Sequence, residues 1–129
     1  MANGTIAFDT LQTSGQITGT AKSVDTDYVV NGSAKAWSNV NGTGTIAIND
    51  SFNVSGVTDN GTGDITNTFS NAMSNTSYVM TISGGYVNDD GMARYSEATA
   101  NWRTYYYNED TRDAKDGSVN SSAIHGDLA

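Results

Sequence analysis

The sequence predicts an all-β protein, a small antiparallel β-sandwich or barrel-like module with hairpin turns and an extended N-terminal arm. Three observations point to this fold class. Short runs of alternating or β-branched residues follow one another along the chain, as is typical of strands. The chain is rich in Gly, Ser, Thr, Asn and Asp, which disfavour helices and favour turns. Asn-Gly pairs, which suit type I′ hairpin turns, recur at Asn3-Gly4, Asn31-Gly32, Asn41-Gly42 and Asn60-Gly61.

The 129 residues suffice for one domain. Strands are expected, in chain order, at Thr5–Phe8, Gln16–Thr20, Tyr28–Asn31, Ala34–Val40, Thr43–Asn49, Phe52–Thr58, Asp64–Phe69, Ser77–Ser83, Ala98–Tyr107 and Ser118–His125. A short helical turn near Phe69–Met73 is the one helical alternative, and no capping residue supports it. Residues 1–27 carry only scattered apolar side chains, so they are expected to form an extended arm for docking or assembly, or a strand pair completed by another subunit. The β-sandwich module is expected to span residues 28–129.

Charge and cysteine content exclude several classes of function. The formal net charge is −8, so phosphate backbones and anionic membranes would repel the chain, and nucleic-acid binding is not expected. The chain has no cysteine, hence neither disulfides nor thiolate metal sites. No apolar run approaches the roughly 20 residues of a membrane span. The N-terminus lacks the basic and apolar regions of a signal peptide, so the protein is expected to leave its cytoplasm only by lysis or assembly.

The segment Ala98–Tyr107 is the most informative predicted strand. Alternation places Ala98, Ala100, Trp102, Thr104 and Tyr106 on a core-facing side. The opposite side carries three residues of the kinds enriched at interfaces, and these are the binding or subunit-interface candidates: Arg103, Tyr105 and Tyr107. The tyrosines are expected either to pack against loops or a neighbouring subunit, or to contact a receptor or a sugar.

The sequence contains little that predicts catalysis, and the chain is not expected to be an enzyme or to need a cofactor. The single histidine, His125, lacks the sequence context of a Ser-His-Asp triad. Acidic residues cluster after the aromatic strand, and Asp110, Asp113 and Asp116 are weak candidates for a Ca²⁺ site. Their spacing does not match an EF-hand loop, so a solvated acidic loop is the favoured interpretation and no metal is expected.

An ordered set of motifs adds a resemblance. Along the chain these are Lys35-Ala36-Trp37, Asn41-Gly42-Thr43-Gly44-Thr45, Ser51-Phe52-Asn53-Val54-Ser55, Thr58-Asp59-Asn60-Gly61-Thr62-Gly63-Asp64 and Ser118-Val119-Asn120-Ser121-Ser122-Ala123-Ile124. The set resembles a C-terminal module of tail-fibre and related virion structural proteins of bacteriophages that infect cyanobacteria and other marine bacteria. It covers residues 32–127, about three-quarters of the chain.

The resemblance implies a β-rich virion structural protein, homo-oligomeric and most simply trimeric, with no catalytic residues and no obligate cofactor. The expected function is that of a tail-fibre- or tip-like module for assembly and host-surface adhesion. Its expected partners are copies of itself, other virion proteins and a host-surface glycan. Two alternatives stay open: a capsid or tail decoration protein without host contact, and a free carbohydrate-binding module acting through Tyr105 and Tyr107.

Overall fold

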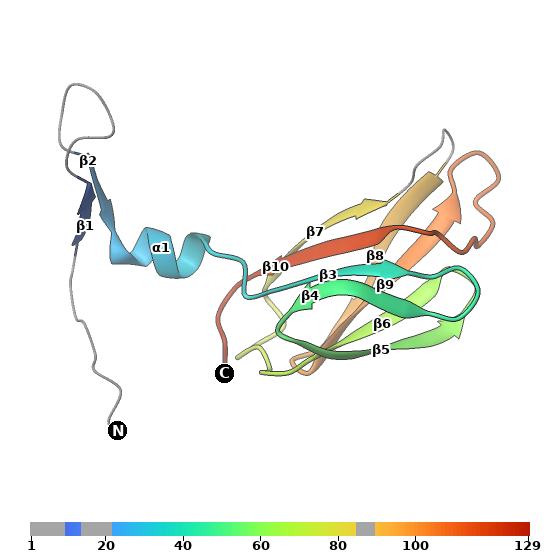
Figure 1. Ribbon diagram of the computed structural model, residues 1–129, viewed down its shortest axis with the longest axis horizontal. Helices are drawn as coiled ribbons and strands as arrows, with labels where there is room; N and C mark the ends of the chain where they lie inside the picture. The colour runs from blue at the N-terminus through green and yellow to red at the C-terminus, as the bar shows by residue number, and fades with distance from the viewer. Residues whose placement is uncertain (1–9, 14–21, 85–89) are drawn as a thin grey trace. The chain divides into compact units, whose positions relative to one another are not determined.

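A computed structural model describes residues 10–13, 22–84 and 90–129 (Figure 1). The chain divides into two compact units, Met1–Ser33 and Ala34–Ala129. Within the second unit, two four-stranded antiparallel sheets pack together, which confirms the all-β class and the sandwich architecture.

The first sheet has the strand order β4-β3-β10-β7 and the second has β5-β6-β9-β8, as Figure 1 shows. In the first sheet the strands are β3 (Ala36–Asn41), β4 (Ala47–Phe52), β7 (Val79–Gly84) and β10 (Asn120–His125). In the second they are β5 (Val54–Gly61), β6 (Asp64–Phe69), β8 (Asp90–Glu97) and β9 (Asn101–Asn108). The central strands β3, β10, β6 and β9 come from four predicted runs, whereas no run was predicted over β8.

The first unit contains the antiparallel pair β1 (Thr10–Thr13) and β2 (Lys22–Asp25), followed by the helix α1 (Thr26–Gly32). The strand predicted at Tyr28–Asn31 is therefore wrong. The β-branched run suggested a strand, but these residues belong to α1, and the Tyr28, Val29 and Val30 side chains are exposed. The strands predicted over residues 5–8 and 16–20 lie outside the described residues. The units divide after Ser33, whereas composition placed the boundary after residue 27.

The Asn-Gly pairs at the hairpins do not adopt the predicted type I′ turn. Neither Asn41 nor Asn60 has a positive φ. In these loops the residues with positive φ are Gly44, Gly61 and Gly63. The Asn41 side chain acts as a local acceptor: its Oδ1 accepts hydrogen bonds from the Thr43 amide (3.1 Å) and hydroxyl (2.7 Å). The pair Asn31-Gly32 ends α1, and Asn3-Gly4 lies outside the described residues.

The chain passes from the first sheet to the second at Asn53, which has φ 56°. Its Nδ2 donates to the carbonyl oxygens of Lys35 (3.0 Å) and Asn71 (3.1 Å), and its Oδ1 accepts from the Asn71 amide (2.7 Å). Asparagine tolerates this left-handed conformation better than most residues. The helical turn considered near Phe69–Met73 is absent, since Phe69 ends β6 and Met73 forms a β-bridge with Leu128.

The interior between the sheets includes two distinct parts, and it also buries Val40, Ile65, Thr104, Tyr106 and Asn120. One is an apolar cluster of six buried residues: Ala36, Phe69, Met73, Tyr78, Trp102 and Ile124. The other is a polar seam of three buried side chains, Ser38, Asn67 and Ser122. Both parts draw on alternate residues of the central strands, whose buried positions recur with a period of two in β3, β6, β9 and β10. This alternation leaves the other side chains of the same strands on the two outer faces of the sandwich.

Candidate functional site

The outer face of the second sheet carries the residues predicted from Ala98–Tyr107. In β9, Trp102, Thr104 and Tyr106 are buried, while the intervening side chains are only partly buried. The predicted assignment of faces is therefore confirmed for the strand itself. The strand begins at Asn101, three residues later than predicted, so Ala98–Ala100 precede it.

Three tyrosine rings form a row on this face, and two arginines contact it. The ring centroids of Tyr95 and Tyr105 are 6.2 Å apart, as are those of Tyr105 and Tyr107. The Arg103 guanidinium lies over the Tyr95 ring, 4.5 Å from its centroid, and the Arg112 guanidinium lies 5.3 Å from the Tyr107 centroid. We call these five residues the tyrosine row.

Tyr95 was not among the predicted site residues, because its strand was not predicted. It lies in β8, where the pairing with β9 shifts register between Arg94 and Ser96, so that Ala93 pairs with Tyr105 and Ser96 with Arg103. Apolar and polar residues alternate only weakly in Gly-Met-Ala-Arg-Tyr-Ser. The aromatic Tyr95 was the one residue in this segment that favours a strand.

Arg103, one of the two arginines of the row, is held by Asp64 of β6. The Arg103 Nε and Nη2 atoms both donate to the Asp64 carboxylate, a two-point pairing that holds the guanidinium in one orientation. The hydrogen bond to Arg103 lowers the pKa of Asp64, and the same bond raises the pKa of Arg103. The pair therefore remains charged at neutral pH.

Tyr107 is positioned by a glycine on the neighbouring strand. Gly91 pairs with Tyr107, and a Cβ atom at Gly91 would lie 2.7 Å from the tyrosine Cζ atom. The Tyr107 ring thus occupies the space that a side chain at residue 91 would need. Glycine is the residue that permits this contact.

The acidic residues after β9 do not converge. The Asp110 amide donates to Asn108 Oδ1 (2.9 Å), the Asp113 carbonyl accepts from the Asn108 amide (2.9 Å), and Asp116 Oδ1 accepts from the Gly63 amide (2.7 Å). Among the described residues, no three His, Cys, Asp or Glu side chains are grouped so that they could hold a metal ion. His125 ends β10 opposite Val79 on the edge strand β7.

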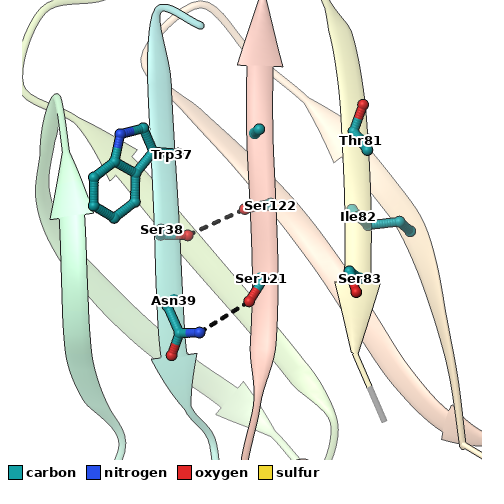
Figure 2. A pocket seen from close by; sticks show the side chains of 9 residues that line it. Trp37, Ser38, Asn39, Thr81, Ile82, Ser83, Ser121 and Ser122 are labelled. Carbon is teal, nitrogen blue, oxygen red and sulfur yellow. Dashed lines mark hydrogen bonds between the residues drawn. The ribbon is translucent and has the colours of Figure 1, made fainter.

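The outer face of the first sheet carries a second feature that the sequence did not single out. An open groove crosses β3, β10 and β7, as Figure 2 shows. It is lined by nine residues, which are Trp37, Ser38, Asn39, Thr81, Ile82, Ser83, Ser121, Ser122 and Ala123. We call it the Trp37 groove. Trp37 appeared in the sequence only as part of a motif, although it alternates with the buried Ala36 and Ser38 in β3 and therefore shares the outer face with Asn39.

Comparison with protein-family models, with curated proteins and with solved structures finds no match to this chain. Within the part of the chain that the structure describes, no helix has the length and apolarity needed to cross a membrane. The two outer faces of the sandwich are therefore the basis for a functional proposal.

Proposed function

We propose that this chain is a structural protein of a bacteriophage particle, a tail-fibre- or tip-like module that assembles as a homo-oligomer, most simply a trimer, and takes part in host-surface adhesion. It has no catalytic role in this proposal and needs no cofactor. Its partners are copies of itself, other virion proteins and a glycan on the host surface. It is made in the host cytoplasm, resides in the virion and is released by lysis.

The observation that carries the proposal is the tyrosine row, which supports an interface role for the second sheet. Tyrosine and arginine are enriched at protein interfaces because they combine a large contact area with polar tips. Here three tyrosine rings are adjacent, and Tyr95 remains 59% exposed. An exposed surface of this composition is suited to contact with a partner.

The tyrosine row is also ordered before any partner binds. Asp64 orients Arg103, Arg103 lies over Tyr95, and Arg112 lies over Tyr107. Side chains that are already held in one arrangement lose little conformational entropy on association. This preorganisation favours a stable contact between subunits over a transient one. The proposed place in a phage particle is supported by the ordered motifs over residues 32–127, which resemble those of phage fibre modules.

Light scattering on the purified chain tests the assembly part of the proposal. We expect the mass of a trimer for the full chain, and a monomer for the double variant Tyr105→Ser, Tyr107→Ser, which removes two rings from the contact. Trp37→Ser, on the other sheet, is the matched control and should keep the trimer. A monomeric full chain would contradict the trimeric proposal, and a trimeric double variant would remove the tyrosine row from the interface.

The location on the particle is tested by gold-labelled antibodies on purified phage particles in the electron microscope. Label at the tail fibre or tip is the expected result. Label over the capsid or along the tail tube would favour the alternative of a decoration protein without host contact. Particles that bind no antibody, while the purified chain does, would overturn the virion proposal and leave a free carbohydrate-binding module as the stronger alternative.

A further inference from the structure

We propose that the Trp37 groove is a binding site for a neutral saccharide. The inference rests on the chemistry of the groove and does not depend on the tyrosine row or on a place in a phage particle. It assigns sugar binding to the first sheet, whereas the sequence had suggested Tyr105 and Tyr107 on the second.

The lining of the groove is uncharged. None of its nine residues is acidic or basic, although the chain as a whole has a net charge of −8. An anionic ligand would require a cation in such a site, and a cationic ligand a carboxylate. Hydroxyl, amide and indole groups are present instead, and these match a ligand that carries hydroxyl groups and no charge.

The register of the strands arranges the lining in two parallel rows. Trp37, Ala123 and Thr81 lie opposite one another across β3, β10 and β7, and the next row contains Asn39, Ser121 and Ser83. Neighbouring strands are about 4.8 Å apart, so each row spans roughly 10 Å. The first row contains the Trp37 indole, the small Ala123 side chain and the Thr81 hydroxyl. The second row contains only polar side chains.

The indole of Trp37 supplies the apolar contact. Trp37 is 36% exposed, whereas Trp102, the other tryptophan of the chain, is fully buried in the core. A pyranose ring has one or two faces of C–H groups and an edge of hydroxyls, so it can place a C–H face on the indole while its hydroxyls point along the sheet. An aromatic side chain beside a few oriented polar groups is the usual composition of a small-molecule site.

The polar row is oriented by its own hydrogen bonds. Asn39 Nδ2 donates a hydrogen bond to Ser121 Oγ (3.0 Å), which Figure 2 shows. Asn39 Oδ1 accepts a hydrogen bond from Asn49 Nδ2 (2.7 Å). Ser121 accepts in this arrangement, which leaves its hydroxyl hydrogen for a ligand. A hydroxyl both donates and accepts, so Ser121, Ser83 and Thr81 can exchange hydrogen bonds with sugar hydroxyls in either direction.

The floor of the groove depends on one small side chain. Ala123 lies between Trp37 and Thr81 in the register, and a long side chain at this position would rise between the two walls. Ala123→Leu therefore fills the groove without touching the interior, because the side chain faces outward. Ala123→Ser keeps the floor small and is its matched control.

A glycan array probed with the full chain, followed by calorimetric titration of any ligand into each variant and by tryptophan fluorescence of the full chain, tests the proposal. We expect binding to at least one neutral oligosaccharide, with a change in Trp37 emission. Its dissociation constant should rise at least tenfold in Trp37→Ala and in Ala123→Leu. It should stay unchanged in Ala123→Ser. Unchanged thermal unfolding confirms that each variant is folded.

Failure to bind any neutral glycan on the array would overturn the proposal, as would binding only to acidic glycans or undiminished binding by Trp37→Ala. A change of solution mass in Ala123→Leu would also overturn it, because the groove would then be a contact between copies of the chain. None of these results bears on whether antibodies label phage particles, so the two proposals can fail separately.

Discussion

The interior of the sandwich contains two regions that are stabilised differently. At one end, Phe69 lies between Trp102 and Tyr78, with ring centroids 4.5 Å and 5.9 Å away. Farther along the same strands, Ser38, Asn67 and Ser122 meet across the sheets. The apolar cluster gains free energy from area removed from water, whereas the polar seam must be satisfied bond by bond.

The polar seam forms one directed chain of hydrogen bonds. Ser38 Oγ donates its hydrogen to Asn67 Oδ1 (2.9 Å), so Ser122 is the donor in its 3.1 Å contact with Ser38. Ser122 in turn accepts from Trp102 Nε1 (2.9 Å). The chain crosses between the sheets twice, because β3 and β10 belong to the first and β6 and β9 to the second. The seam thus joins particular residues of the two sheets, whereas the cluster stabilises the sandwich through burial without directed bonds.

The largest effect is expected in the apolar cluster. Phe69→Ala should lower the free energy of unfolding by about 3–5 kcal/mol, because it removes a buried ring and leaves a cavity. Urea unfolding followed by circular dichroism measures this change. Phe52→Ala is the matched control: Phe52 is 54% exposed, and its loss should cost no more than about 0.5 kcal/mol. Equal losses at both positions would contradict the assignment of the core.

A smaller effect is expected in the polar seam. Ser122→Ala should cost about 1–3 kcal/mol, because the Trp102 indole N–H is left buried without an acceptor. Ser121 precedes Ser122 in β10 and faces outward, so Ser121→Ala is the matched control. It should lower the free energy of unfolding by no more than about 0.5 kcal/mol. Adding Trp102→Phe to Ser122→Ala removes the stranded donor, so the double variant should lose less than the two single losses added together. Strict additivity would contradict the coupling.

The smallest effect at neutral pH is expected where the cluster meets a polar group. The Tyr78 hydroxyl contacts the carbonyl oxygens of Ala98 (3.2 Å) and Asn101 (3.1 Å), so Tyr78→Phe should cost about 1 kcal/mol at pH 7. Burial, with the charge of Glu97, raises the pKa of Tyr78 from 10.0 to about 12. The folded state therefore favours the neutral phenol, and this stabilisation is complete below pH 10.

As pH rises from 10 to 12, the unfolded chain ionises Tyr78 and the folded chain does not, so stability falls. The expected loss attributable to this residue is about 2 kcal/mol. Tyr78→Phe lacks this titration and should lose less stability over the same interval, which urea titrations at each pH would measure. Parallel pH profiles for the two proteins would show that Tyr78 titrates normally.

The amino-acid sequence was sufficient to locate the strands that alternate clearly and, for the segment Ala98–Tyr107, to assign the side chains to the two faces of the sheet. The segments predicted as Asp64–Phe69 and Ala98–Tyr107 became β6 and β9, with Trp102 inside and Arg103 outside as expected. This information is local, because a strand repeats every two residues whatever its partners are. A local pattern misled at Tyr28–Asn31, where a β-branched run formed part of α1 instead.

Which outward side chains meet depends on how the strands pair in the folded chain. Asp64 reaches Arg103 because β6 pairs with β9, and Tyr95 joins the tyrosine row through a register shift in β8. The Trp37 groove likewise needs three strands, with β10 between β3 and β7. Strand order and register depend on contacts between distant parts of the chain, which no local pattern encodes. The sites therefore lie where strands pair, while the strands themselves could be recognised one at a time.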